Sequence, residues 1–183
     1  MSSEYDVAVV GATGAVGEAM ISILEERKFP VRTLYALASS RSAGKSVMFR
    51  GKSVRVTDLA EFDFSQVQIG LFSAGGSISQ QFAPIAAAAG CVVIDNTSHF
   101  RQDDDIPLIV PEVNINALVG YRARNIIANP NCSTIQMVVA LKALNNLSPI
   151  KRVHVSSYQS ASGAGAMGMA ELEQQVKDFV ANK

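Results

Sequence analysis

Residues 7–17 read VAVVGATGAVG, an apolar run that leads directly into a turn with glycine at positions 11, 14 and 17. The unbroken apolar run predicts a central parallel strand that is covered on both faces. Apolar residues at helical spacing follow the turn and stop before Pro30, which predicts a helix. Strand, glycine turn and helix in this order predict a dinucleotide-binding α/β domain, because bare glycines let backbone N–H groups approach a pyrophosphate and a helix N-terminus stabilises the anion.

The glycine turn is a variant of the usual dinucleotide fingerprint, because Thr13 stands where a second glycine is expected. A tight turn between strand and helix that binds no ligand is the alternative, and the position near the start of the chain favours cofactor binding. The predicted cofactor-binding residues of this turn are Gly11, Thr13, Gly14, Ala15, Val16 and Gly17.

The loop after the second predicted strand, residues 33–38, indicates which nicotinamide cofactor is bound. An NAD-binding domain offers an Asp or Glu there for the ribose hydroxyl, whereas residues 39–45 contain hydroxyls and cations and no carboxylate. A guanidinium can hold a phosphate bidentately. Arg41 and Ser42 therefore predict NADP, with a solvated basic loop as the competing interpretation.

The rest of the N-terminal part alternates between strands and helices in the same way. Buried strands are predicted at 68–72, 91–95 and 125–128, a small hairpin at 47–50 and 53–57, and helices at 78–89 and near 116–119. This order predicts a Rossmann-type α/β fold, a doubly wound and mostly parallel sheet, over residues 1–132. Ser73 follows one of these strands at the edge where ligands collect, and Cys91 is predicted to pack inside another.

Cys132 is the predicted site of chemistry. The strand before it stops at Pro130, and Ser133-x-x-Gln136 has the spacing of a capping box that starts a helix. Cys132 is then expected just ahead of the helix, where the dipole and the free N–H groups favour the nucleophilic thiolate. A small buried hydrophobe is the alternative for a lone cysteine.

Residues 96–101, NTSHFR, also follow a predicted strand and lie at the ligand edge. Spacing alone favours a surface ion pair between Arg101 and the acidic run 103–105, which would be worth little. His99 can act as a general base, but a loop histidine is more often simply solvated.

The C-terminal part has a different pattern, which predicts the beginning of an α+β domain over residues 133–183. After the Ser148-Pro149 break, residues 151–159 alternate between apolar and polar side chains and predict a strand with one covered face. A flexible loop at 160–168 and an amphipathic helix at 171–180 are expected to follow.

The composition excludes several classes of protein. Sixteen basic and sixteen acidic residues cancel over 183 residues, so no nucleic-acid-binding charge is present. The apolar runs are too short to span a membrane, and the N-terminus, residues 1–6, does not read as a secretory signal. Two cysteines without metal-type spacing fit a reducing cytoplasm and predict no metal site.

Six motifs in family order resemble aspartate-β-semialdehyde dehydrogenase. They are the glycine turn, SxRSAGK at 39–45, DNTSxFR at 95–101, VPEVN at 110–114, NPNCST at 129–134 and YQxxSGAG at 158–165. The resemblance implies that Cys132 forms an acyl-enzyme, that Arg101 binds the substrate phosphate and that Gln159 orients the substrate. Cys132 and Gln159 are therefore the predicted catalytic residues, and Asn131 joins Arg101 and Gln159 as a predicted substrate- or phosphate-binding residue. It also implies that Ser162 and Gly163 join the glycine turn, Arg41, Ser42 and Ser73 in contacting NADP.

The implied reaction is the NADPH-dependent reduction of aspartyl β-phosphate to aspartate β-semialdehyde with release of phosphate, in lysine, diaminopimelate, methionine and threonine synthesis. Such enzymes are homodimers or tetramers of about twice this length, and their second half carries a histidine acid–base, an arginine and a lysine. The 183 residues alone are therefore expected to turn over poorly or not at all. An N-acetyl-glutamyl-phosphate reductase and a non-catalytic NADP-binding or assembly module are the rival interpretations.

Overall fold

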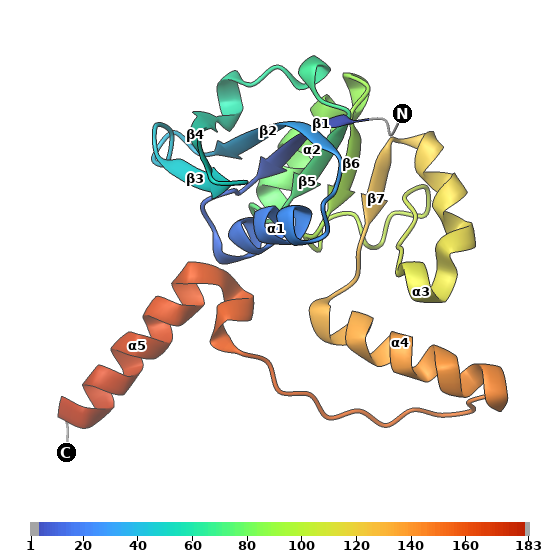
Figure 1. Ribbon diagram of the computed structural model, residues 1–183. Coiled ribbons are helices and arrows are strands. Elements are labelled where there is room, and N and C mark those ends of the chain that lie inside the picture. Colours follow the sequence, from blue (N-terminus) through green and yellow to red (C-terminus); the bar gives the residue numbers. More distant parts are fainter. Residues whose placement is uncertain (1–3, 182–183) are drawn as a thin grey trace. The chain divides into compact units, whose positions relative to one another are not determined.

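The computed structural model in Figure 1 describes residues 4–181. The chain divides into two compact units, Met1–Lys142 and Ala143–Lys183. Residues 1–3, which belong to the N-terminal stretch predicted not to be a secretory signal, lie outside the described residues. Between residues 4 and 181, no helix has the length and hydropathy that crossing a membrane requires.

The first unit is built on a seven-stranded sheet with the order β3-β4-β2-β1-β5-β6-β7. Every neighbouring pair is parallel except β3–β4, the predicted hairpin, which is antiparallel. The strands are β1 (Tyr5–Val10), β2 (Val31–Ala38), β3 (Ser46–Phe49), β4 (Lys52–Asp58), β5 (Ile69–Phe72), β6 (Val92–Asp95) and β7 (Ile126–Ala128). The chain builds outward from β1 in one direction and then from β5 in the other. The predicted doubly wound sheet is therefore confirmed, and its switch point lies between β1 and β5.

The two long helices of the sheet cover opposite faces, α1 (Ala15–Glu26) on one and α2 (Gly76–Ala88) on the other (Figure 1). Alternate residues of β1 explain this arrangement: Val7 and Val9 pack in a buried cluster with Ile21 of α1, whereas Ala8 and Val10 pack in a cluster with Ala83 of α2. A strand buried on both sides must be apolar at every position, as the sequence predicted. Cys91 is fully buried just before β6, also as predicted.

Shorter helices connect the strands at the edges of the sheet. They are η1 (Leu59–Glu61), η2 (Phe64–Gln66), α3 (Pro111–Asn114) and η3 (Ile115–Ala123), of which the last covers the short helix predicted near 116–119. Asp58 and Asp63 start η1 and η2, because their carboxylates accept backbone N–H bonds from Ala60 and Ser65 at 3.0 and 2.9 Å. The helix α4 (Cys132–Leu147) then follows β7.

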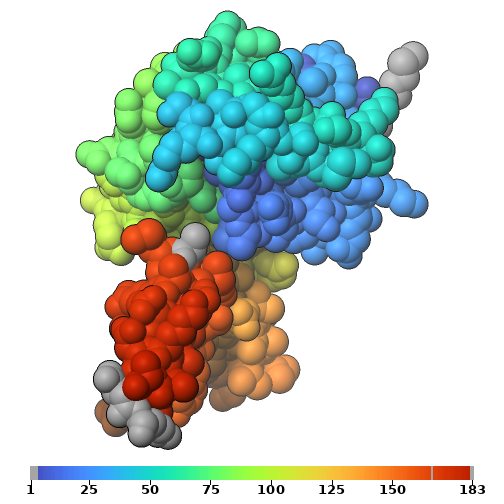
Figure 2. All heavy atoms as spheres, turned by 90° about the vertical axis from the view of Figure 1, so that its left-hand side faces the viewer, coloured from blue at the N-terminus to red at the C-terminus, as the bar shows by residue number. Residues whose placement is uncertain are grey.

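The second unit corrects two predictions. Residues 151–159 have no regular structure, so the predicted strand is wrong: the alternating pattern is present, but no strand within residues 4–181 pairs with it. The predicted flexible loop is also wrong, because Ser160 caps η4 (Ala161–Ala164) and α5 (Gly165–Ala181) begins directly after it. Figure 2 shows α5 in red, and its apolar residues Leu172 and Val176 are exposed.

Candidate cofactor site and reactive thiol

The glycine turn closes the switch point of the sheet. Gly11 adopts φ +89°, a conformation that side chains rarely tolerate, and a Cβ there would lie 2.9 Å from the carbonyl oxygen of Ser73. The N–H groups of Gly11 and Ala12 both donate to the Leu37 carbonyl, at 2.8 and 3.1 Å. The ends of β1, β2 and β5 are therefore joined at one point, and the predicted ligand residue Ser73 lies against the predicted glycine turn.

The start of α1 leaves backbone donors available for a ligand. Gly14 is the N-cap in extended conformation, and the first helical bond runs from the Glu18 N–H to the Gly14 carbonyl at 2.9 Å. Within residues 4–181 no acceptor pairs with the N–H groups of Ala15, Val16 or Gly17. A pyrophosphate is the kind of group that such open N–H groups at a helix N-terminus bind, so the residues present fit a dinucleotide.

Gly17 holds this geometry in place. A Cβ on Gly17 would lie 2.1 Å from the carbonyl oxygen of Gly11, a separation that no side chain can adopt. The helix can therefore approach the turn this closely only with glycine at position 17. Gly14 is different, because a Cβ there would lie 3.4 Å from the same oxygen.

The loop after β2 presents a free cation. Its backbone folds on itself, since the N–H groups of Ser42 and Ala43 donate to the Ser39 carbonyl at 2.8 and 3.1 Å. Arg41 is exposed, and its guanidinium bonds to no other group in the described part of the chain, while Ser42 is half-buried. The structure thus leaves the predicted phosphate ligand Arg41 open to a ligand.

Cys132 is exposed, whereas Cys91 is buried, and neither forms a disulfide. Cys132 is the first residue of α4 itself. Burial raises the pKa of the Cys91 thiol to about 12, because an apolar environment disfavours the charged thiolate. The alternative of a small buried hydrophobe therefore applies to Cys91 and is wrong for Cys132.

Asn131, rather than the predicted Ser133, caps α4. The Asn131 Oδ1 accepts the Ser133 N–H at 3.1 Å and the Ser133 hydroxyl at 2.5 Å. The predicted capping box is wrong because Ser133 already lies inside the helix, and Gln136 Nε2 instead donates to the Cys132 carbonyl at 3.3 Å. An asparagine before the first helical residue was the signal for this cap.

Arg101 does not form the surface ion pair that spacing favoured. Its Nε donates to the carbonyl of Asn129 at 2.9 Å and its Nη2 to the carbonyl of Asn96 at 3.1 Å. The acidic run pairs with Arg124 instead, whose Nη1 lies 3.3 Å from both Asp103 Oδ2 and Asp105 Oδ1. Arg101 is thereby joined to the loop that carries Cys132. His99 is exposed, and its ring lies edge-on against Phe100.

Two asparagines that sequence reasoning did not select complete this loop. Asn129 Nδ2 donates to Asn96 Oδ1 at 2.7 Å, and the Asn129 N–H donates to the Asp95 carbonyl at 3.0 Å. Each asparagine is the first residue after a parallel strand, β6 or β7. That position at the carboxyl edge of the sheet was the signal available in the sequence.

The remaining predicted residues lie in the second unit. Gln159 packs against Gly163, where an added Cβ would lie 2.5 Å from Gln159 Nε2. The hydroxyls of Ser160 and Ser162 are 2.9 Å apart. Gln159, Ser162 and Gly163 thus form one local cluster at the start of η4.

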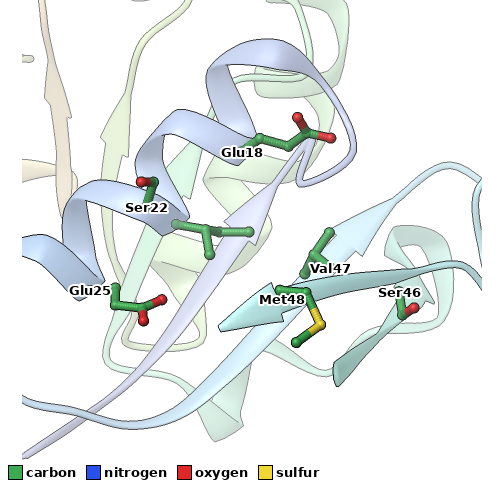
Figure 3. Close-up of a pocket in the computed structure, with 7 residues that line it drawn as sticks. Glu18, Ser22, Glu25, Ser46, Val47 and Met48 are labelled. Carbon is green, nitrogen blue, oxygen red and sulfur yellow. The ribbon is translucent and has the colours of Figure 1, made fainter. Parts of the chain in front are cut away.

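A hollow of about 320 Å³ lies elsewhere, between α1 and β3 (Figure 3). Glu18 and Glu25 project from α1 beside Val47 and Met48 of β3. None of the predicted cofactor residues lines it, and its two carboxylates disfavour a phosphate. No group of three or more His, Cys, Asp or Glu side chains suited to a metal ion occurs between residues 4 and 181.

The glycine turn at the switch point, followed by open N–H groups at the start of α1, is typical of a Rossmann-type dinucleotide-binding domain, and the loop before Cys132 follows a strand at the same sheet edge. Comparison identifies the family. Residues 6–121 match the model of the semialdehyde dehydrogenase NAD binding domain, and residues 141–183 match that of the semialdehyde dehydrogenase dimerisation domain. The chain belongs to the semialdehyde dehydrogenase family, which confirms the resemblance seen in its motifs.

Individual relatives agree with this assignment. The chain is 62% identical over 175 residues to aspartate-semialdehyde dehydrogenase 2 of Vibrio cholerae, covering 96% of this chain and 52% of the relative. Aspartate semialdehyde dehydrogenase II of Vibrio cholerae complexed with ASA superposes with a TM-score of 0.93 at 58% identity, over 99% of this chain and 54% of that one. The enzyme of Candida albicans with NADP gives 0.68 at 25% identity, over 81% and 48%. The chain thus spans about half the length of these relatives.

Proposed function

We propose that the protein to which this chain belongs is an NADP-dependent aspartate-semialdehyde dehydrogenase, which reduces aspartyl β-phosphate to aspartate β-semialdehyde and releases phosphate. One observation carries the proposal: the exposed thiol of Cys132 begins α4, and the Arg101 guanidinium is bonded to Asn129 in the same loop. A nucleophile, and a cation bonded to the loop that precedes it, suit an acyl phosphate, whose carbon is attacked and whose phosphate leaves. The Vibrio cholerae relatives carry this enzyme name, and one was solved with ASA.

Cys132 supplies the nucleophile. As a thiolate, its Sγ attacks the acyl carbon, the bond between that carbon and the phosphate oxygen breaks, and phosphate leaves with the bonding electrons to give a thioester. The positive end of α4 favours the oxyanion that develops on the acyl oxygen. NADPH, when bound, supplies the hydride that reduces the acyl group.

Arg101 and Asn131 bind the leaving phosphate in this proposal. The Nε of Arg101 and one Nη2 hydrogen are used by the two carbonyls, so the Nη1 group remains for an anion. The Asn131 Oδ1 accepts both bonds from Ser133, so the side-chain N–H groups of Asn131 remain available for the phosphate. Gln159 orients the substrate.

NADP binds the glycine turn through the open N–H groups of Ala15, Val16 and Gly17, with Gly11, Thr13, Gly14 and Ser73 shaping the turn. The exposed Arg41, with Ser42, binds the 2′-phosphate, because no carboxylate in residues 39–45 repels it. Ser162 and Gly163 complete the cofactor contacts. Support comes from the family model, which is named for NAD binding, and from the Candida albicans structure with NADP.

The remaining assignments follow from this activity. Residues 1–132 form the NADP-binding domain, and residues 133–183 begin the catalytic and dimerisation domain of a homodimer or tetramer. The enzyme works in the cytoplasm, where free thiols persist. It supplies lysine, diaminopimelate, methionine and threonine synthesis, and it requires neither nucleic acid nor a membrane.

Acyl transfer to the thiol provides the test. The full-length protein to which this chain belongs is mixed with aspartyl β-phosphate in the absence of NADPH, and phosphate release and the mass of the Cys132 peptide are followed through a single turnover. We expect one thioester per chain and an equal amount of phosphate, both lost in C132S. If the Cys132 peptide keeps its unmodified mass in an excess of aspartyl β-phosphate, the assignment is refuted.

Acylation and alkylation of Cys132 separate the two rival functions. An N-acetyl-glutamyl-phosphate reductase would acylate from N-acetyl-glutamyl phosphate and not from aspartyl β-phosphate. A non-catalytic NADP-binding module would show a slowly alkylated thiol whose rate does not depend on pH. A comparison of NADP and NAD affinities in wild type and R41A tests the cofactor preference, which we expect R41A to abolish.

A further inference from the structure

We propose that the side-chain amides of Asn129 and Asn96 form a clamp that sets the position of the Arg101 guanidinium, so that both asparagines are positioning residues for the phosphate-binding step. The proposal rests on the proposed function for its consequence in phosphate binding. Its geometric part concerns only Arg101 and its two carbonyl partners, and it is tested without phosphate.

The clamp is closed by reciprocal contacts. Arg101 bonds to the backbone carbonyls of Asn129 and Asn96, at 2.9 and 3.1 Å, and the side chains of these same two residues bond to each other at 2.7 Å. Each asparagine therefore offers its carbonyl to the guanidinium and its amide to its partner. The guanidinium keeps both hydrogen bonds only while the two carbonyls keep their separation. The hydrogen bond between the two side-chain amides fixes that separation.

The sheet itself stops short of the two carbonyls that Arg101 contacts. The ladder between β6 and β7 ends at the pair Asp95 and Ala128, directly before the two asparagines. Beyond it, the Asn129 N–H donates to the Asp95 carbonyl at 3.0 Å, and the Ile109 N–H donates to the Ala128 carbonyl at 2.9 Å. The hydrogen bond between the Asn129 and Asn96 side chains therefore links the residues that carry the two carbonyls, beyond the last paired residues of β6 and β7.

The Asn96 side of the clamp is anchored in the core. The fully buried Asp95 carboxylate accepts hydroxyl bonds from Ser79 of α2 and from Thr97, both at 2.7 Å. The Asn96 N–H donates to the Phe72 carbonyl at 2.9 Å. These bonds hold the backbone of Asn96 and of its neighbours. Asn129 then joins the loop before Cys132 to Asn96.

The test measures the Arg101 Nε–H directly. In ¹⁵N-labelled 183-residue chain, its side-chain signal, assigned with R101K, is expected to exchange slowly with solvent. We expect N129A and N96A each to speed this exchange about fivefold, the size of effect that one lost hydrogen bond produces. The double variant should exchange no faster than either single variant, because both remove the same bond. The exposed Asn116 on η3 gives the matched control, N116A, which should leave the rate unchanged.

A second readout links the clamp to phosphate. Inorganic phosphate should slow alkylation of Cys132, and the half-protecting concentration should rise about fivefold in N129A, while the alkylation rate without phosphate stays at the wild-type value. A merely structural role would change the unprotected rate and the Tm instead. Unchanged Nε–H exchange in folded N129A, or exchange rates that add in the double variant, would overturn the clamp. Altered exchange with no phosphate protection in wild type would support the clamp and refute the phosphate role of Arg101.

Discussion

The two cysteines have the same chemistry and opposite environments, and the fold decides which one reacts. Cys132 is exposed at the first position of α4, whereas Cys91 is buried, with a pKa raised to about 12 by loss of solvation. Reaction with an electrophile requires an accessible sulfur, and of the two cysteines only Cys132 is exposed.

We therefore expect iodoacetamide at pH 8 to modify one thiol per native chain and two per chain in denaturant. Intact-mass and peptide-mass measurements give the count and the position. In C132S the native chain should remain unmodified. Labelling of Cys91 in native C132S at the wild-type rate would show that burial does not protect it.

A second residue-scale prediction concerns acid stability. Asp6 is buried, and hydrogen bonds from Arg32 lower the pKa of its carboxyl group, against an opposing effect of desolvation. A lowered folded-state pKa means that the unfolded chain binds more protons in acid. The contribution of Asp6 to stability is therefore present above its unfolded pKa of about 3.9 and is lost as the pH falls through the folded value.

The check is urea unfolding of wild type and D6N at pH 7, 5 and 3. The free energy of unfolding should favour wild type at pH 7, and the difference should shrink at pH 3. R32Q should lose the same pH-dependent part of the free energy of unfolding. The double variant D6N/R32Q should lose no more of that part than D6N alone. A difference between wild type and D6N that grows towards acid would contradict the ion pair as its source.

At the scale of elements, the glycine turn gives a prediction with an internal control. A Cβ on Gly17 would lie 2.1 Å from the Gly11 carbonyl oxygen, whereas a Cβ on Gly14 would lie 3.4 Å from it in a backbone conformation open to any residue. We expect G17A to destabilise the first unit by about 3 kcal/mol, as overpacking does, because α1 must move away from β1. G14A should cost about 0.5 kcal/mol. Urea midpoints measure both, and equal losses would mean that the close approach is not needed.

Elements that are defined by burial were predictable, and those that depend on a partner were not. The strand β1 is apolar at every position because helices cover both of its faces, and such a run leaves a clear pattern in the sequence. Residues 151–159 carry an equally clear alternation, but a strand forms only where another strand offers its donors and acceptors. The alternation indicates which face of a strand would be covered, but it does not indicate whether a partner strand is present.

The candidate site divides in the same way. Glycines with an obligatory conformation, such as Gly11, and a cysteine before a helix can be found from local sequence. Arg101 could not be placed from spacing, because Arg124, more than twenty residues away along the chain, takes the acidic partners and leaves Arg101 to the carbonyls. Competition between distant side chains for one partner is a property of the folded chain.

At the scale of the whole molecule, the predicted ligand residues of the first unit come from loops that follow parallel strands. The loops after β1, β2, β5, β6 and β7 carry the glycine turn, Arg41, Ser73, Arg101 and Cys132. Parallel strands bring these loops to one edge, so a cofactor and a thiol can share a site although more than one hundred residues separate them. In the second unit, Gln159 lies in residues 151–159, which have no regular structure, whereas Ser162 and Gly163 lie in η4.

The segment 151–159 is where we expect a protease to cut the chain first. Residues 151–159 are exposed and have no regular structure, and Lys151 and Arg152 are trypsin sites within them. A protease needs several residues in extended form, which this stretch offers without unfolding, whereas cleavage after Arg124 requires opening of its Tyr121 bond and its ion pairs. We expect the first cut after Lys151 or Arg152, followed by mass spectrometry, and slower digestion of K151Q/R152Q. First cuts within residues 4–142 would mean that the sheet unit opens more readily than the segment, against the hydrogen bonds that hold its loops.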